Sequence, residues 1–194
     1  MKLYANQKEN TRTEFIFLPI FFVILFACAT VPTKIYDETV SQWKSHEDVA
    51  NWMRQNFVYD MSQVKQAILQ PNSITLYPAE KTFRYKSGIC FDAAQFAKET
   101  LNRIDPSYEA EIVYLRNQPQ DIDHIVCSFK KDNKFYIMDY GTVYDNMIGT
   151  HGPFNSLEEY KEFYERHHPK VKHVQSISYT RPPFSNVPRY IKYY

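Results

Sequence analysis

A repeat of small and apolar residues with helical spacing starts at Cys90 and predicts a helix there. Ser87 and Gly88, directly before it, suit a sharp turn into the helix. The residues that share the expected buried face are Cys90, Ala93, Ala94, Ala97, Leu101 and Ile104. Because this face is apolar along its whole length, we expect the helix to pack against a sheet or another helix.

Capping motifs predict two further helices, which begin after residues 45–48 and 156–159. Apolar residues follow each motif at helical spacing. His46 lies within the first cap, where we expect it to be solvated. Weaker helical patterns cover residues 36–43 and 61–70. Residues 73–85 are expected to form loop and extended chain that leads to the Cys90 helix.

Alternation of apolar and polar residues predicts an antiparallel arrangement of strands in the second half of the chain. The segments that alternate, or that are rich in β-branched and aromatic residues, are 108–116, 123–130, 134–140 and 171–179. The polar tip Lys131-Asp132-Asn133 joins the second and third of these as a hairpin. No internal repeat or linker marks a second domain.

The first 27 residues have the pattern of an export signal. Lys2, Lys8 and Arg12 form a basic leader before the apolar run 15–27. This run is shorter than the ~20 residues that a membrane-spanning helix needs. Residues 25–28 resemble the lipobox of bacterial lipoproteins, which implies cleavage before Cys28 and a lipid on its thiol. A secretory signal without a lipid and an uncleaved anchor are the alternatives, and both export the domain.

This interpretation divides the chain into a signal peptide (1–27), a lipidated Cys28 with its tether (28–44) and one domain (45–194). It places the protein at the bacterial cell envelope, held on the periplasmic face of a membrane by its lipid. Ala29 favours the outer membrane, because an aspartate at this position is associated with inner-membrane retention in many lipoproteins.

Composition narrows the classes of function. With 44% hydrophobic and 16% aromatic residues among 194, the chain can bury a core and is not disordered. A net charge of +1, with basic and acidic residues interleaved, argues against a nucleic-acid partner. Lipidation of Cys28 leaves Cys90 and Cys127, too few for a disulfide framework. An unpaired thiol in an exported protein is therefore a candidate for chemistry.

Cys90 is the candidate nucleophile. The free N–H groups and the positive dipole end of a helix favour a thiolate, which is the reactive form of cysteine. A cysteine on an apolar helix face can equally be a buried structural residue. His124 and Asp139 favour the catalytic interpretation, because a histidine can take the thiol proton while a carboxylate orients the imidazole.

The loop between the two hairpin strands decides whether His124 and Asp139 meet. A two-residue turn at 131–132 would make them direct cross-strand partners, and one at 132–133 would place them diagonally on the same face. A three-residue loop without a bulge would place them on opposite faces. By the same alternation Cys127 points away from His124, and we expect it in the core.

These motifs resemble the transglutaminase-like superfamily of papain-like cysteine enzymes. The resemblance covers roughly residues 48–142, and its motifs are Ser87-Gly88-Ile89-Cys90, Asp123-His124 and Met138-Asp139-Tyr140-Gly141-Thr142. It implies an α+β fold with a papain-like core, in which the nucleophile helix packs on an antiparallel sheet. It also implies a catalytic triad of Cys90, His124 and Asp139. Ile125 and Tyr140 replace an aromatic residue and a proline often found in the family, which bears on substrate preference.

The family also uses an oxyanion donor upstream of its cysteine. Tyr59, Tyr77 and Tyr85 can each donate a hydrogen bond, and the sequence does not choose among them. His151 is either a loop contact or a rival base.

We therefore predict a thiol-dependent acyl-transfer enzyme that forms a thioester on Cys90 with a protein or peptide amide and needs no cofactor. Protease, amidase and cross-linking enzyme share this chemistry, and water is favoured as acceptor because nothing marks a lysine-binding tunnel. An inactive binding or assembly module of the same fold is the alternative. A metal site at Cys90, His124 and Asp139 is disfavoured, because the sequence has no close-spaced ligand pair. Substrate and oligomeric state are not indicated.

Overall fold

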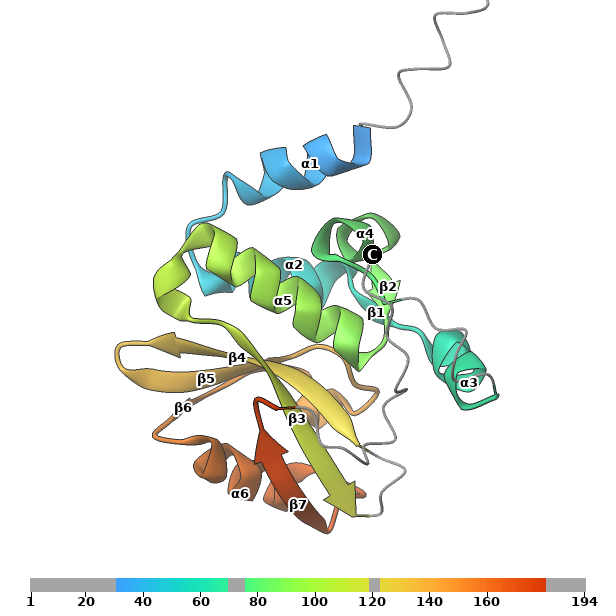
Figure 1. The fold of residues 1–194 in the computed structure, drawn as a ribbon, viewed down its shortest axis with the longest axis vertical. Coiled ribbons are helices and arrows are strands. Elements are labelled where there is room, and N and C mark those ends of the chain that lie inside the picture. The colour runs from blue at the N-terminus through green and yellow to red at the C-terminus, as the bar shows by residue number, and fades with distance from the viewer. Residues whose placement is uncertain (1–30, 70–75, 119–122, 181–194) are drawn as a thin grey trace, which may run out of the picture. The chain divides into compact units, whose positions relative to one another are not determined.

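The computed structural model describes residues 31–69, 76–118 and 123–180 (Figure 1). The chain divides into two compact units, residues 1–31 and 32–194, and the elements below belong to the second apart from Val31. The expected signal peptide (1–27) and Cys28 lie outside the described residues. Within the described ranges, no helix combines the length and apolar character needed to cross a membrane.

Helices predominate in the first half of the chain, with two short strands between them, and strands predominate in the second. The helices are α1 (Val31–Val40), α2 (His46–Asn56), α3 (Met61–Leu69), α4 (Ala79–Tyr85), α5 (Cys90–Ile104) and α6 (Leu157–His167). The strands are β1 (Val58–Tyr59), β2 (Ser87–Gly88), β3 (Glu111–Gln118), β4 (His124–Lys131), β5 (Lys134–Asp139), β6 (Gly149–Phe154) and β7 (His173–Ser178). Short 3₁₀ turns, η2 (Pro106–Tyr108) and η4 (Asp145–Met147), follow α5 and precede β6.

A five-stranded antiparallel sheet has the order β6-β5-β4-β3-β7. Strands β4 and β5 form the expected hairpin, and Lys131 pairs with Lys134 across a turn at Asp132 and Asn133. Both turn residues have positive φ, 52° and 57°, as the favoured two-residue hairpin turn requires. A separate pair of short parallel strands consists of β1 and β2, and β2 ends two residues before α5 begins.

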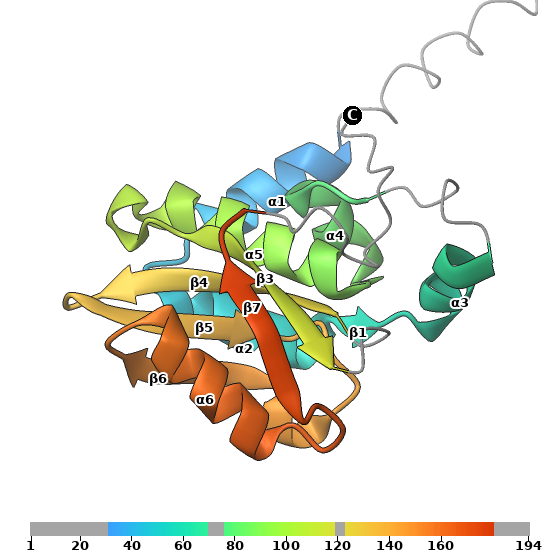
Figure 2. The same ribbon diagram turned by 60° about the horizontal axis from the view of Figure 1, so that its bottom comes forward.

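Helices cover both faces of the sheet (Figures 1 and 2). Helices α2, α4 and α5 cover one face, and α6 covers the other. One hydrophobic cluster, which includes Phe96, Ile125 and Cys127, lies between the sheet and α5. A second cluster, which includes Val126, Ile137 and Tyr164, lies between the sheet and α6. The predicted α+β class, with the Cys90 helix packed on an antiparallel sheet, is confirmed.

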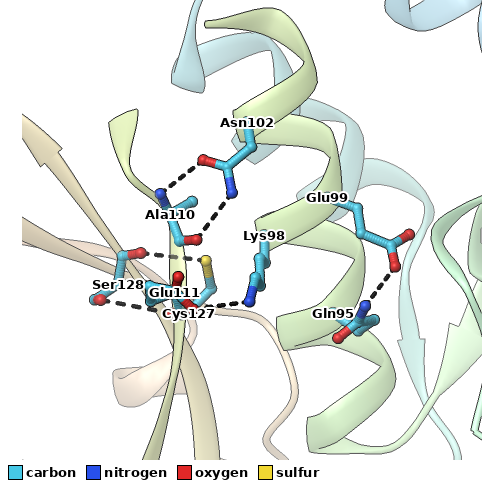
Figure 3. A network of polar contacts seen from close by, with 8 residues as sticks. All are labelled: Gln95, Lys98, Glu99, Asn102, Ala110, Glu111, Cys127 and Ser128. Carbon is cyan, nitrogen blue, oxygen red and sulfur yellow. Dashed lines mark hydrogen bonds and ion pairs between the residues drawn. The ribbon is translucent and has the colours of Figure 1, made fainter. Parts of the chain in front are cut away.

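Polar contacts fix α5 on the sheet (Figure 3). The Asn102 side chain donates to the Ala110 carbonyl oxygen at 2.9 Å and accepts from the Ala110 N–H at 2.7 Å. One turn earlier, Lys98 forms an ion pair with Glu111 of β3 at 2.7 Å. These contacts set the direction of the helix and therefore the place of its first residue, Cys90.

Helix α1 packs on the same domain as α5. Tyr36 and Val40 are buried in the first core cluster, and the Tyr36 hydroxyl lies 2.9 Å from that of Thr100 on α5. The sequence predicts that these positions belong to a tether (28–44). In the structure the Tyr36 ring contacts those of Phe83 on α4 and Phe96 on α5, with 5.5 and 6.3 Å between centroids.

Two local expectations are wrong. Residues 79–85 form helix α4 rather than loop, because α4 docks on α5, where Glu99 accepts from the Ala79 N–H at 2.9 Å. His46 is buried rather than solvated, because its ring lies among the rings of Tyr108, Phe129 and Tyr136. In both cases the partners are distant in sequence. Strand β6, which contains two glycines and a proline, was not anticipated.

Candidate active site

Three chain segments bring Cys90, His124 and Asp139 to one end of the sheet. Cys90 is the first residue of α5, His124 is the first of β4, and Asp139 is the last of β5. Because β4 and β5 are antiparallel, the start of one strand lies beside the end of the other. The N-terminus of α5 meets this end of the sheet.

His124 and Asp139 form a buried hydrogen-bonded pair. The His124 Nε2 atom lies 2.8 Å from Asp139 Oδ2. The two residues are 8% and 1% exposed. The register, in which Cys127 pairs with Met138, makes them diagonal neighbours on one face. Of the loops that the sequence left open, the structure thus has the two-residue turn at 132–133. The carboxylate therefore fixes the position of the Nε2 atom of the imidazole.

The Cys90 thiol is the other hydrogen-bond partner of the His124 ring. Burial by itself lowers the pKa of His124, but the Asp139 charge and the hydrogen bonds to Asp139 and Cys90 outweigh burial and raise this pKa to about 10. The imidazole is then positively charged at neutral pH. Since Nε2 is occupied by Asp139, Nδ1 is the atom left for the thiol. The imidazolium therefore lies beside the candidate nucleophile, Cys90.

Asp92 shapes the turn that presents Cys90. Its carboxylate accepts from the Ile89 N–H at 2.9 Å and from the Tyr77 N–H at 2.7 Å, so it ties two loops to the first turn of α5. Burial raises the pKa of Asp92 to about 6, against the effect of these hydrogen bonds. A negative charge here offsets part of the helix dipole.

Two glycines allow close packing around the turn. A Cβ atom on Gly88 would lie 2.6 Å from the Cβ of Asp92. A Cβ atom on Gly141 would lie 2.5 Å from the Cα of Cys90 and 3.1 Å from the Cβ of Ala93. The Gly141 N–H also donates to Asp139 Oδ1 at 3.2 Å. The segment after Asp139 is thus pressed directly against the candidate nucleophile.

Of the three tyrosines that the sequence left open as oxyanion donors, Tyr59 lies by the candidate nucleophile. It pairs with Gly88 across β1 and β2, two residues before Cys90. Burial, followed by the negative charges of Cys90 and Asp139, raises the pKa of Tyr59, so its hydroxyl keeps its proton. Tyr77 and Tyr85 instead contact each other at 5.3 Å between ring centroids, with Lys81 over both rings.

The other sequence candidates lie apart from this centre. Cys127 is fully buried on the α5 side of the sheet, as expected, and burial raises the pKa of its thiol. His151 on β6 has its Nε2 atom 2.7 Å from the Met147 carbonyl oxygen, and its ring lies by Phe163. In the described part of the chain, no three His, Cys, Asp or Glu side chains are grouped so that they could hold a metal ion.

Helix α6 contributes to the site in a way that the sequence does not indicate. Tyr164 is one of the apolar residues that follow the second capping motif at helical spacing, and it is buried. Its ring also lies beside the His124 ring, with 6.1 Å between centroids and 24° between planes. His168, the residue that follows α6, stacks on Tyr164, with 4.9 Å between ring centroids. Helical periodicity predicts that Tyr164 faces the sheet. It does not predict which strand residue lies opposite.

Comparisons with known proteins give one match by sequence and a few by fold. A family model described as a transglutaminase-like domain matches residues 27–151. A comparison with curated proteins found no significant match. A crystal structure of a TGase is 13% identical, with a TM-score of 0.40 over 73% of this chain and 36% of that chain. Calcium-bound Legionella pneumophila LapG is 14% identical, with a TM-score of 0.32 over 61% of this chain and 76% of that one. The chain thus spans little more than a third of the TGase chain.

Proposed function

Because the chain belongs to the transglutaminase-like domain family, in which cysteine protease or acyltransferase activity is usual, we propose that it is a thiol-dependent acyl-transfer enzyme. Cys90 is the nucleophile, His124 the general base and acid, and Asp139 the residue that orients His124. The observation that carries this proposal is the buried hydrogen bond of 2.8 Å between His124 and Asp139, next to a thiol at a helix N-terminus.

The reaction proceeds in two steps. The thiol proton resides on His124, and the Cys90 thiolate attacks the carbonyl carbon of a protein or peptide amide. His124 then gives its proton to the departing amine, which leaves a thioester on Cys90. Water, or a second amine, then attacks the thioester carbonyl carbon, and His124 takes a proton from this attacking molecule. The acyl product leaves, and Cys90 is regenerated with its proton on His124. General-base transfer of this kind contributes on the order of 100- to 10,000-fold.

Charge on the carbonyl oxygen develops during both attacks and needs hydrogen-bond donors. The backbone N–H groups at the start of α5 are one source, and the Tyr59 hydroxyl is the side-chain donor that we assign. Loss of one such donor typically costs ~100- to 1,000-fold in rate. Tyr59→Phe removes the hydroxyl with little change in shape, so it tests this role separately from that of Cys90.

The proposed site of action is the periplasmic face of the cell envelope, with the outer membrane favoured over the inner. Support comes from the basic leader, the apolar run 15–27 and the lipobox-like residues 25–28. The lipid on Cys28 anchors the enzyme, and its substrates are proteins or peptides within reach. Mass spectrometry of the mature N-terminus tests the lipid anchor: a diacylated Cys28 supports it, and an unmodified or uncleaved N-terminus contradicts it.

The decisive test of the enzyme is the alkylation of Cys90 as a function of pH in the full chain, followed by peptide mass spectrometry so that each cysteine is scored separately. We expect Cys90 to react with iodoacetamide at pH 6–7, and His124→Ala and Asp139→Asn to slow this reaction. Cys127 is the internal control, since it is fully buried and should stay unmodified. If Cys90 reacts only after unfolding, the enzyme proposal fails and the inactive binding module replaces it.

A further inference from the structure

We propose that Tyr164 and His168 are positioning residues, which hold the His124 ring in its reactive orientation and keep water from one side of it. This inference rests on the proposed function, because it assigns a role toward the general base of that reaction. Neither residue is placed in contact with the substrate.

The three rings form a column that starts at the candidate base. His124 and Tyr164 are nearly parallel, with 6.1 Å between centroids, and Tyr164 and His168 are stacked at 4.9 Å. The edge of Tyr144 meets His168 at 4.5 Å and closes the column. Tyr164 and His168 are 1% and 6% exposed, so these two rings of the column are buried in the protein interior.

The backbone after α6 fixes the far end of the column. The Nδ1 atom of His168 accepts from the Val171 N–H at 2.9 Å and from the Lys170 N–H at 3.2 Å. An imidazole that accepts at Nδ1 is neutral and carries its proton on Nε2. Burial, and then the positive charge of His124, lower the pKa of His168 to about 4. The column therefore brings no second positive charge toward the His124 imidazolium.

A second set of contacts links Tyr164 to the strand that carries His124. The Asn117 side chain donates to the Tyr164 hydroxyl at 3.5 Å, and the Asn117 N–H donates to Asp123 Oδ1 at 2.9 Å. Asp123 directly precedes His124. Helix α6 thus supports His124 through its ring face and through the start of its strand.

The column accounts for part of the burial of the His124–Asp139 pair, which is 8% and 1% exposed. Asp139 fixes one ring nitrogen but leaves the ring free to tilt about that hydrogen bond. A flat aromatic neighbour limits the tilt, and it replaces water that would compete for the Nε2 proton. Misplacement of a reacting group by about 1 Å can cost on the order of 100-fold in rate, so a small tilt matters.

The test compares Tyr164→Leu, which removes the ring, with Tyr164→Phe, which keeps it. His168→Asn keeps an acceptor near the position of Nδ1 but removes the second ring. Phe154→Leu is the matched control, because Phe154 is buried in the same core cluster and contacts Tyr160 and Phe163 rather than His124. For each full-length variant, thermal unfolding reports folding, and NMR of ¹⁵N-histidine reports exchange of the His124 Nε2 proton with water.

We expect the Nε2 proton to be protected from exchange in the wild type, Tyr164→Phe and Phe154→Leu, and to exchange rapidly in Tyr164→Leu and, less so, in His168→Asn. Cys90 alkylation near neutral pH should fall on the order of 10-fold or more in Tyr164→Leu. A folded Tyr164→Leu protein with wild-type exchange overturns the proposal, as does a Tyr164→Phe protein that behaves like Tyr164→Leu. If Tyr164→Leu does not fold, His168→Asn replaces it: faster exchange of the His124 Nε2 proton than in the wild type supports the proposal, and wild-type exchange overturns it.

The two proposals fail separately. An unreactive Cys90 in the wild type refutes the enzyme, whereas the exchange of the His124 proton still tests the column. A reactive Cys90 whose His124 proton is unaffected by loss of the rings refutes the column alone.

Discussion

Gly141 shows how closely the candidate nucleophile is confined. The residue lies against the backbone of Cys90, where a Cβ atom would approach the Cys90 Cα to 2.5 Å. A side chain at this position is excluded by the close contact and not by the backbone conformation, since Gly141 does not have a positive φ. A side chain here must therefore move either the end of β5 or the start of α5.

We expect Gly141→Ala to lower stability by about 1–3 kcal/mol, as overpacking usually does, and to slow Cys90 alkylation by displacing the thiol from His124. Chemical denaturation and alkylation rates measure the two effects. Gly149→Ala is the control: its Cβ meets nothing within 4 Å, although its φ of 146° strains any side chain. It should cost stability and leave Cys90 reactivity unchanged. Equal slowing in both variants would contradict the steric argument.

His124 should make the folding free energy depend on pH above neutrality. Its pKa is raised from 6.5 to about 10, by Asp139 and Cys90 against the effect of burial. The folded state thus holds a proton that the unfolded chain releases near pH 6.5. This contribution to stability is complete below pH 6.5 and is lost as pH rises toward 10. Urea denaturation at pH 6.5 and 9 should show the loss in the wild type and a smaller one in Asp139→Asn; equal losses would refute it.

His46 should make the free energy of unfolding decrease as the pH falls below neutrality, whereas His124 makes it decrease as the pH rises. Burial lowers its pKa below 6.5, with Glu47 opposing and Lys131 adding to this effect. The unfolded chain then takes up a proton that the folded state resists, so this stabilisation is present above pH 6.5 and is lost as pH falls below it. His46→Phe keeps the ring cluster. The stability difference between wild type and variant should change between pH 7 and 5, and a constant difference would contradict the assignment.

Among the elements, the β4–β5 hairpin links the local sequence to the geometry of the site most directly. Its two-residue turn fixes the pairing, and the pairing sets His124 and Asp139 on one face. The turn itself lies at the opposite end of the hairpin from these residues. A change in the turn can therefore reach the site only through the register of the strands.

Asn133 has a φ of 57°, a conformation that β-branched residues resist. We expect Asn133→Val to destabilise the protein by about 1–2 kcal/mol, the usual cost of a left-handed conformation. Asn133→Gly, which tolerates positive φ, should be close to the wild type. Denaturant unfolding compares the variants. If the valine variant were as stable as the glycine variant, this turn type would be wrong.

For the whole molecule, helices on both faces of the sheet supply the site. Helix α5 provides Cys90 from one face, and α6 provides Tyr164 from the other, while the sheet between them carries His124 and Asp139. The two hydrophobic clusters therefore need to form together for the site to be complete. Helix α1 adds to the first of these clusters.

The domain should accordingly depend on α1. Each fully buried large side chain contributes ~1.5–3 kcal/mol, and Tyr36 and Val40 are 4% and 2% exposed. We expect a chain that starts at Ser45 to be less stable by about 3–6 kcal/mol than one that starts at Cys28. Thermal denaturation measures this. Ile35→Ala in the longer chain is the control, because Ile35 is 50% exposed and its loss should cost little.

The sequence by itself determined the elements that depend on near neighbours. Helical spacing identified α5 and its buried face, capping motifs identified the starts of α2 and α6, and strand alternation placed Cys127 on the face opposite His124. These features follow from the repeat of a helix or strand, which about 15 residues of sequence are enough to show. The length of the hairpin loop, which decides whether Asp139 shares a face with His124, was left open by the sequence and is given by the structure.

Only the tertiary structure decided which of these elements meet. The approach of Cys90 to His124, the choice of Tyr59 over Tyr77 and Tyr85, and the column of Tyr164 and His168 depend on how helices dock on the sheet. The burial of His46 has the same origin, since its aromatic neighbours lie more than 60 residues away. Periodicity states which face of a helix is buried, but the partner of that face is set by side-chain packing between segments far apart in the chain.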